Sequence, residues 1–218
     1  DLETKALISL DQQQWGNFQF LNEISLKGTF APDNLPLENI AHRLGIFETS
    51  FEIFGKIYTS LDRLQTLRLV GSDKKWLGNE FGSVKNLKRL HFDTCSIKSL
   101  DMISPLTEIQ ILVLAGCRSL SDVSILPKIK SLEHLVISEC RSIKDWSFLR
   151  NMPWLKSLRV TNAIDASIIS DLPNLRFISV ANPKKGELQK WRKNEQDKKF
   201  GKVMGFNLQT LIKEGVIR

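Results

Sequence analysis

Several features that would assign this chain to a membrane-spanning or secreted class are missing from its sequence. No apolar run approaches the ~18 residues that span a bilayer, and the first residues contain no basic segment followed by an apolar one. No Asn-X-Ser/Thr sequon occurs, and the three cysteines, an odd number, cannot all pair within the chain. These absences favour a reducing, cytoplasmic setting. A leader removed before Asp1 remains the alternative.

Catalytic motifs are missing as well. The sequence contains no glycine-rich phosphate loop, no paired zinc-ligand motif and no nucleophile elbow. The net charge is also small over most of the chain. The total is +7, but ten Lys/Arg and four acids after residue 182 account for six of these charges. The basic character therefore belongs to the C-terminal tail and says little about the main body.

An internal repeat is the strongest feature that the chain does contain. Six strings share the pattern apolar-x-x-apolar-x-apolar, and their first residues lie 23, 22, 23, 23 and 20 residues apart. They are LQTLRL from residue 64, LKRLHF from 87, IQILVL from 109, LEHLVI from 132, LKSLRV from 155 and LRFISV from 175. Two weaker copies precede them, LNEISL from residue 21 and AHRLGI from residue 41.

With these strings the chain resembles leucine-rich-repeat proteins, in particular the short-repeat type of bacterial, internalin-like members. The stretch ISPLTEIQILVLAGC is the closest to the family pattern, and the resemblance covers residues 21–182. It implies an α/β fold: a right-handed leucine-rich-repeat solenoid with a concave parallel β-sheet and short 3-10 or helical segments on the convex side. It also implies a binding scaffold rather than an enzyme.

The physical chemistry of the repeat agrees with this expectation. In each strand the second and third anchors point into the solenoid and the residues between them point outward. Stacked copies, about 4.8 Å apart, bury one continuous core that no single copy could bury. We expect residues 1–20 to form an N-terminal cap, residues 21–182 the solenoid, and residues 183–218 a basic helical C-terminal cap. Its helices are expected from Glu187 to Phe200 and from Asn207 to Gly215.

The three cysteines recur at one position of the repeat. Cys95, Cys117 and Cys140 each lie eight residues after the first anchor of their copy. Thr29, Thr49, Ser72, Ala163 and Pro183 occupy the same column. In the family this position is inward and small, so the thiols are expected to be structural. Three thiols at one position of successive repeats also provide no fourth ligand for zinc.

The histidines are expected on outward positions of alternate rungs. His42, His91 and His134 would then lie about 10 Å apart, too far for two of them to share a zinc ion. Asp93 follows His91 on the same face and could orient it, but no Ser or Cys is placed to complete a triad. We expect no metal and no cofactor. An enzyme built around His91 remains a minor alternative.

The concave face is the expected binding surface. Ile111, Val113, Ala115 and Val136 form an apolar centre flanked by charged residues, an arrangement that protein interfaces favour. The alternative is that a parallel sheet simply accepts β-branched residues on both faces. The second copy is expected to add Arg43, Gly45 and Phe47 to this face. The predicted contact residues are Arg68, Arg89, His91, Asp93, Ile111, Val113, His134, Val136, Arg159 and Phe177.

These observations predict a non-enzymatic protein-protein interaction module, monomeric by default, which could act as a stand-alone inhibitor or immunity-type protein. The rival hypothesis is nucleic-acid or anionic-surface binding through the basic tail. There Lys184 to Lys202 is interleaved with aromatic residues, Trp191 and Phe200 among them. A solvated capping helix is the simpler interpretation of that tail, because its acids are interspersed with its bases.

Overall fold

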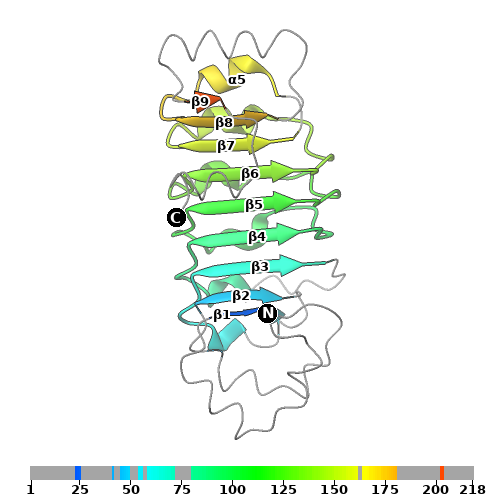
Figure 1. Cartoon of the computed structure of the whole chain (residues 1–218), viewed down its shortest axis with the longest axis vertical. Helices are drawn as coiled ribbons and strands as arrows, with labels where there is room; N and C mark the ends of the chain where they lie inside the picture. The colour runs from blue at the N-terminus through cyan, green and yellow to red at the C-terminus, as the bar shows by residue number, and fades with distance from the viewer. Residues whose placement is uncertain are drawn as a thin grey trace, which may run out of the picture.

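A single parallel sheet organises the chain. The computed structural model describes residues 23–25, 41, 45–49, 54–55, 58–71, 80–161, 164–180 and 202–203. Within them, nine strands form one sheet in strict chain order, β1 to β9, and every neighbouring pair is parallel. Figure 1 shows the strands stacked as successive rungs. The order and direction confirm the predicted leucine-rich-repeat solenoid.

The strands are short and evenly placed along the chain. Their bounds are β1 Glu23–Ser25, β2 Ile46–Thr49, β3 Thr66–Val70, β4 Arg89–Asp93, β5 Ile111–Ala115, β6 His134–Ser138, β7 Ser157–Val160, β8 Phe177–Val180 and β9 Lys202–Val203. From β3 to β8 the register joins equivalent repeat positions: Leu67 pairs with Leu90, and Leu90 pairs with Leu112. The predicted phase is therefore confirmed for all six strong copies.

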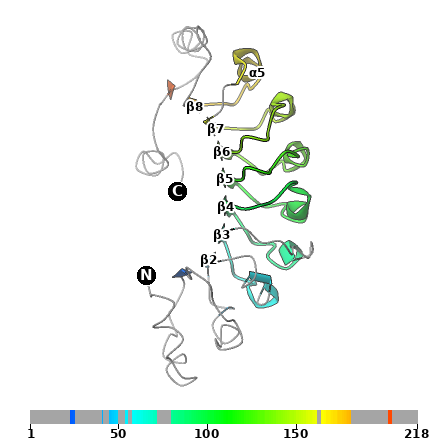
Figure 2. The same cartoon turned by 90° about the vertical axis from the view of Figure 1, so that its right-hand side faces the viewer.

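Short helices lie together on one side of the sheet, as Figure 2 shows. They are the 3-10 helices η2 Tyr58–Ser60, η3 Glu80–Gly82, η4 Asp101–Ile103, η5 Leu126–Lys128 and η6 Ser147–Asn151, and the α-helix α5 Ala166–Ser170. Single turns fit here because, from β2 to β8, only 16 to 18 residues connect one strand to the next. The expectation of 3-10 or single-turn segments is confirmed.

The core fills the space between the sheet and these helices. The second and third anchors of each strong copy are buried, as Leu67 and Leu69 illustrate at 0% exposure. Larger rings occupy the end nearer β3, where Phe81 lies 5.5 Å from Phe54 and 6.2 Å from Phe92 between ring centroids. One continuous cluster of buried side chains runs from Ala41 to Val180. Stacking of rungs thus provides the burial that a single repeat lacks.

The second copy of the repeat departs from the prediction. Phe47 pairs with Leu67 and Thr49 pairs with Leu69, so the strand belongs to the string LGIFET from residue 44 rather than to AHRLGI from residue 41. The error has a physical origin, because AHRLGI has three apolar anchors whereas the true third anchor, Thr49, carries a hydroxyl. Thr49 is nevertheless 0% exposed.

This shift changes the expected composition of the concave face. Phe47 takes a core-side register position, and Gly45 precedes β2 and accepts the N–H groups of Gln65 and Thr66 through its carbonyl oxygen, at 2.9 Å each. The assignment of Gly45 and Phe47 to the outward face is therefore wrong, as is the placement of Thr49 in the cysteine column. Arg43 and His42 lie outside the described residues and precede the start of β2.

The ends of the solenoid are only partly described. Lys202 and Val203 pair with Phe177 and Ile178 as a ninth parallel strand, which the sequence did not predict. The expected N-terminal cap, and the helices expected from Glu187 and from Asn207, lie outside the described residues. Among the helices that are described, none has the length and apolar character needed to cross a membrane.

Candidate functional site

The outward side chains of β3 to β8 form the concave face, and its central row follows directly from the strand register. That row runs Arg68, His91, Val113, Val136, Arg159 and Ser179. Each member comes from a different strand because successive rungs place the same repeat position side by side. The side chains between the anchors alternate with the buried core residues, as the sequence predicts.

The apolar centre of this face is more enclosed than the sequence suggests. Ile111, Val113 and Val136 lie outside the core cluster, yet they are only 8%, 8% and 6% exposed. Their position outside the core agrees with the outward direction predicted from the sequence, which did not reveal how small their exposed fraction is. Outward side chains on neighbouring rungs stand only about 4.8 Å apart and shield one another. These three residues are therefore flush with the face rather than protruding from it.

Charged residues border the apolar centre on the β3 and β4 side. The Arg68 guanidinium forms an ion pair with the Asp93 carboxylate, which follows His91 on the next strand. Both side chains retain partial exposure, at 39% and 24%. Arg89 lies in the neighbouring row, opposite Thr66 on one side and Ile111 on the other. The structure thus brings Arg68, Asp93 and His91 together, whereas Arg89 belongs to a different row.

His91 is held in its neutral form. Burial, together with the neighbouring Arg68 cation, lowers the pKa of His91 to about 4, although Asp93 acts in the opposite direction. Its Nε2 atom is buried and has no hydrogen-bond partner within the described part of the chain. Its two neighbours in the central row, Arg68 and Val113, supply no hydroxyl or thiol nucleophile. The register neighbours of His91 are therefore one cation and one apolar side chain.

His134 lies in a different row from His91. It pairs with Ile111 on one side and with Ser157, which is 2% exposed, on the other. Burial lowers the pKa of His134, with Glu133 opposing the shift and Lys156 adding to it. Across the described ranges no group of three or more His, Cys, Asp or Glu side chains could hold a metal ion.

Arg159 stands in the central row on the opposite side of the apolar centre from Arg68. Its neighbours in the register are Val136 on β6 and Ser179 on β8. Burial lowers the pKa of the Arg159 guanidinium, and no neighbouring charge contributes to the shift. Phe177 lies in the adjacent row beside Ser157. Arg159 is therefore a partly covered cation among neutral side chains.

The cysteine column lies at the strand ends and faces the core. Cys95, Cys117 and Cys140 are free thiols with at most 1% exposure. Each thiol contacts a carbonyl oxygen of the preceding rung, that of Leu69 at 3.3 Å for Cys95 and that of Leu114 at 3.5 Å for Cys140. Contact with Cys117 and burial raise the pKa of Cys140. The expected structural role, with inward direction and contact to backbone, is confirmed.

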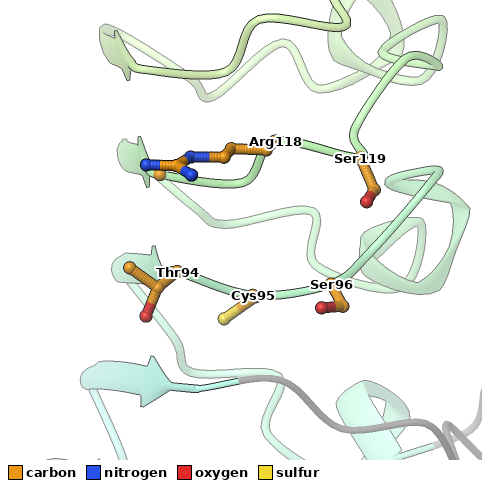
Figure 3. A pocket seen from close by; sticks show the side chains of 6 residues that line it. Thr94, Cys95, Ser96, Arg118 and Ser119 are labelled. Carbon is orange, nitrogen blue, oxygen red and sulfur yellow. The ribbon is translucent and has the colours of Figure 1, made fainter.

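A shallow cavity of about 370 Å³ lies beside this column, between the turns that follow β4 and β5. It is lined by Thr94, Cys95, Ser96, Gly116, Arg118 and Ser119. Figure 3 shows that the Arg118 side chain and the Ser119 hydroxyl lie at opposite ends of their turn. The polar groups do not converge on one point, so the cavity lacks the geometry of an anion site. Sequence reasoning did not single it out.

Comparison with known proteins agrees with this architecture. No family model matches the sequence, and no curated protein is significantly similar to it. Among solved structures, internalin F of Listeria monocytogenes has a TM-score of 0.50 at 18% sequence identity, with 79% of this chain and 58% of the internalin covered. The chain has an internalin-like leucine-rich-repeat fold. At this identity the likeness establishes the fold and nothing more.

Two further structures resemble this internalin-like chain at lower scores. Internalin C2 of Listeria monocytogenes has a TM-score of 0.47 at 18% identity and covers 72% of this chain and 75% of its own length. A leucine-rich-repeat protein of Leptospira interrogans has a TM-score of 0.49 at 15% identity and covers 95% of this chain and 54% of its own. The chain thus spans little more than half the length of two of these three proteins.

Proposed function

We propose that this internalin-like chain is a protein-binding module and that its partner contacts the concave face of β3 to β8. The observation that carries the proposal is the apolar centre, and in particular three of its members, Ile111, Val113 and Val136. These side chains face away from the core cluster, so the packing of the solenoid does not require them to be apolar. Partner proteins commonly place their dominant contacts on such a centre.

The surroundings of the apolar centre support the same proposal. Arg68 and Asp93 border it on one side and Arg159 on the other, and protein interfaces commonly combine an apolar middle with a polar, arginine-rich rim. An interface of this kind needs no bound cofactor. Within protein binding, we propose a stand-alone inhibitor or immunity-type role in the cytoplasm, where buried free thiols such as those of the cysteine column persist.

The test uses two charge insertions at the apolar centre. Affinity capture from the source cell, followed by mass spectrometry, identifies a partner, which is then purified for titration calorimetry. Val113→Arg and Val136→Glu should each weaken binding by at least about 2 kcal/mol, because a charge placed at an apolar interface centre must be desolvated when the partner binds. Lys128→Glu on η5, at the opposite side of the solenoid, is the control and should bind as wild type does.

Thermal melts separate loss of binding from loss of folding. Val113 and Val136 are nearly covered, so each variant is compared with wild type by its unfolding midpoint and by its circular dichroism. If a folded Val113→Arg and a folded Val136→Glu both bind like wild type, the concave face is not the binding surface. If Lys128→Glu alone loses affinity, the partner contacts the helical side instead.

A further inference from the structure

We propose that the partner presents a carboxylate side chain, from Asp or Glu, to Arg159 and places an apolar side chain beside it on Val113 and Val136. The inference rests on the proposed function, because it names the chemistry of the partner at the same face. It follows from the position of Arg159, from the acids around it and from the contrast with Arg68.

Arg159 is the only charged residue among the outward positions of β5 to β8 in the described chain. The other outward residues carry no permanent charge. His134 is the one titratable group among them, and burial lowers its pKa, which favours the neutral form. These other residues are Ile111, Val113, Ala115, His134, Val136, Ser138, Ser157, Phe177 and Ser179. A partner that covers this half of the face must therefore cover a guanidinium to which the solenoid strands offer no counter-charge.

The acids of the surrounding rungs are committed to other groups. Five acids occur between residues 130 and 180, and each contacts a different partner in the described structure. Glu133 contacts Lys156 at 2.6 Å, Glu139 contacts Arg141 at 2.7 Å, Asp145 accepts from Ser147 at 2.8 Å, Asp165 accepts from the Ser167 N–H at 2.8 Å, and Asp171 contacts Arg150 at 2.9 Å. None of them contacts Arg159, so the carboxylate must come from outside these rungs.

Arg68 shows what the same row does when the chain supplies its own acid. It occupies the equivalent repeat position four rungs earlier, and the Asp93 carboxylate already neutralises it. In the register Arg159 lies between Val136 and Ser179, which are both neutral. Arg68 lies between Glu48 and His91, with Asp93 two residues beyond His91. Burial alone lowers the pKa of Arg159, in agreement with a cation that is partly desolvated and unpaired. At one end of the row, Arg68 thus has a counter-charge within the chain. At the other end, the described strands offer Arg159 none, so an acid of the partner can bind there.

A protein carboxylate fits this site better than a nucleic-acid phosphate does. Nucleic-acid backbones are bound by several cations that track successive phosphates, whereas β5 to β8 offer one arginine among apolar neighbours. A guanidinium binds a carboxylate through two parallel hydrogen bonds, and such a pair gains strength where an interface excludes water. The apolar centre beside Arg159 then receives the neighbouring side chain of the same segment.

The experiment selects peptides directly and does not require the natural partner to be identified. A displayed library of random 12-residue peptides is panned against the full wild-type chain, and enriched peptides are synthesised and titrated. We expect enrichment of Asp or Glu next to a large apolar residue. Arg159→Gln should weaken these peptides at least tenfold. Arg159→Lys, which keeps the charge but loses the paired hydrogen bonds, should fall between Arg159→Gln and wild type. Arg118→Gln removes the same charge from a turn off the face and should leave binding unchanged.

Each result bears on the proposal separately from the proposed function. Suppose that the peptides bind Val113→Arg more weakly than wild type. If they are not enriched in Asp or Glu, or if they bind Arg159→Gln as tightly as wild type, the proposed carboxylate contact is wrong and binding at the concave face still stands. If the peptides bind Val113→Arg as tightly as wild type too, both the carboxylate contact and binding at the concave face are wrong. A library that yields no binding peptide would also contradict both proposals. Equal losses in Arg159→Gln and Arg118→Gln would reveal unspecific charge attraction and would also overturn the inference.

Discussion

Thr94 and Gly116 occupy equivalent positions on successive rungs, and the γ-methyl of Thr94 lies 3.0 Å from the point where a Cβ on Gly116 would fall. Both residues directly follow a strand, and both have positive φ, 55° and 65°. Gly71 and Glu139 hold the same position on neighbouring rungs with φ of 94° and 55°. The left-handed conformation is therefore a property of this turn, whichever residue occupies it.

Gly116→Ala should destabilise the chain by about 1 to 2 kcal/mol. Part of the loss comes from the left-handed conformation, which a Cβ disfavours by about 1 kcal/mol, and the rest comes from contact with Thr94. Chemical unfolding measures the change. Gly82→Ala is the matched control, because a Cβ at Gly82 would meet nothing within 4 Å and its φ is not positive.

A double-mutant cycle separates the two contributions. In a Thr94→Gly background the γ-methyl is gone, so Gly116→Ala should lose only the conformational part and its effect should fall by several tenths of a kcal/mol or more. Equal effects of Gly116→Ala in both backgrounds would show that the contact with Thr94 contributes nothing.

Thr49→Val should stabilise the chain by about 1 kcal/mol. The Thr49 side chain is 0% exposed at a core position of β2, and its hydroxyl has no hydrogen-bond partner within the described residues. Valine has a similar shape and removes a buried polar group that lacks a partner. Chemical unfolding of the two proteins provides the measurement. Thr49→Ser is the control and should destabilise, because it keeps the hydroxyl and removes the methyl. A Thr49→Val protein less stable than wild type would contradict the register of β2.

The same residue shows where the sequence was sufficient and where it was not. From β3 to β8 the anchors of each copy are all apolar, so periodicity alone predicted both strand positions and facing. At β2 two overlapping strings compete, and Thr49 conceals the correct one because a hydroxyl counts against burial in any apolar pattern. Only pairing with Leu69 on β3 decides between them.

For the concave face, the sequence likewise predicted which side chains lie on it but not which of them contact one another. Alternation along each strand placed Val113, Val136 and Arg159 on one side of the sheet. The ion pair of Arg68 with Asp93 depends on the relative positions of two side chains 25 residues apart, which periodicity does not supply. Nor does alternation reveal how little of Val136 stays exposed. The positive φ at Thr94 had no sequence signal, because glycine or asparagine normally marks such a turn.

The cysteine column should resist chemical modification. All three thiols are buried, and because the thiolate is the reactive form, their labelling by a maleimide or by a disulfide reagent should require unfolding. Cys117→Ser should destabilise the chain by about 1 to 2 kcal/mol, because serine keeps a donor for the Phe92 carbonyl but fills less volume. Rapid labelling of two or more thiols in the native protein would contradict the inward direction of the column.

Cys117 should also make stability depend on alkaline pH. The Cys140 thiol lowers the pKa of Cys117, but Cys95 and burial outweigh it, so the pKa is raised to about 12. Above pH 9 the unfolded chain releases this proton before the folded chain does, so the free energy of unfolding falls as pH rises toward 12. The difference between wild type and Cys117→Ser, measured at pH 8 and pH 10, isolates this contribution from that of other groups. A constant difference would show that Cys117 titrates normally.

His91 should weaken the fold under mildly acidic conditions. Its folded-state pKa, about 4, lies below the ordinary value of 6.5, so the unfolded chain takes up the proton first as pH falls. The stability that comes from neutral His91 is therefore fully present above pH 6.5 and is lost as pH falls toward 4. The shift corresponds to at most about 3 kcal/mol. The unfolding free energy of His91→Gln minus that of wild type should increase between pH 7 and pH 4.5, because only wild type loses the contribution of neutral His91. An NMR titration provides the direct check. The ring signal that disappears in His91→Gln should stay at its neutral position down to about pH 5, and a midpoint near 6.5 would show that the imidazole is open to water and that its burial on the concave face is wrong.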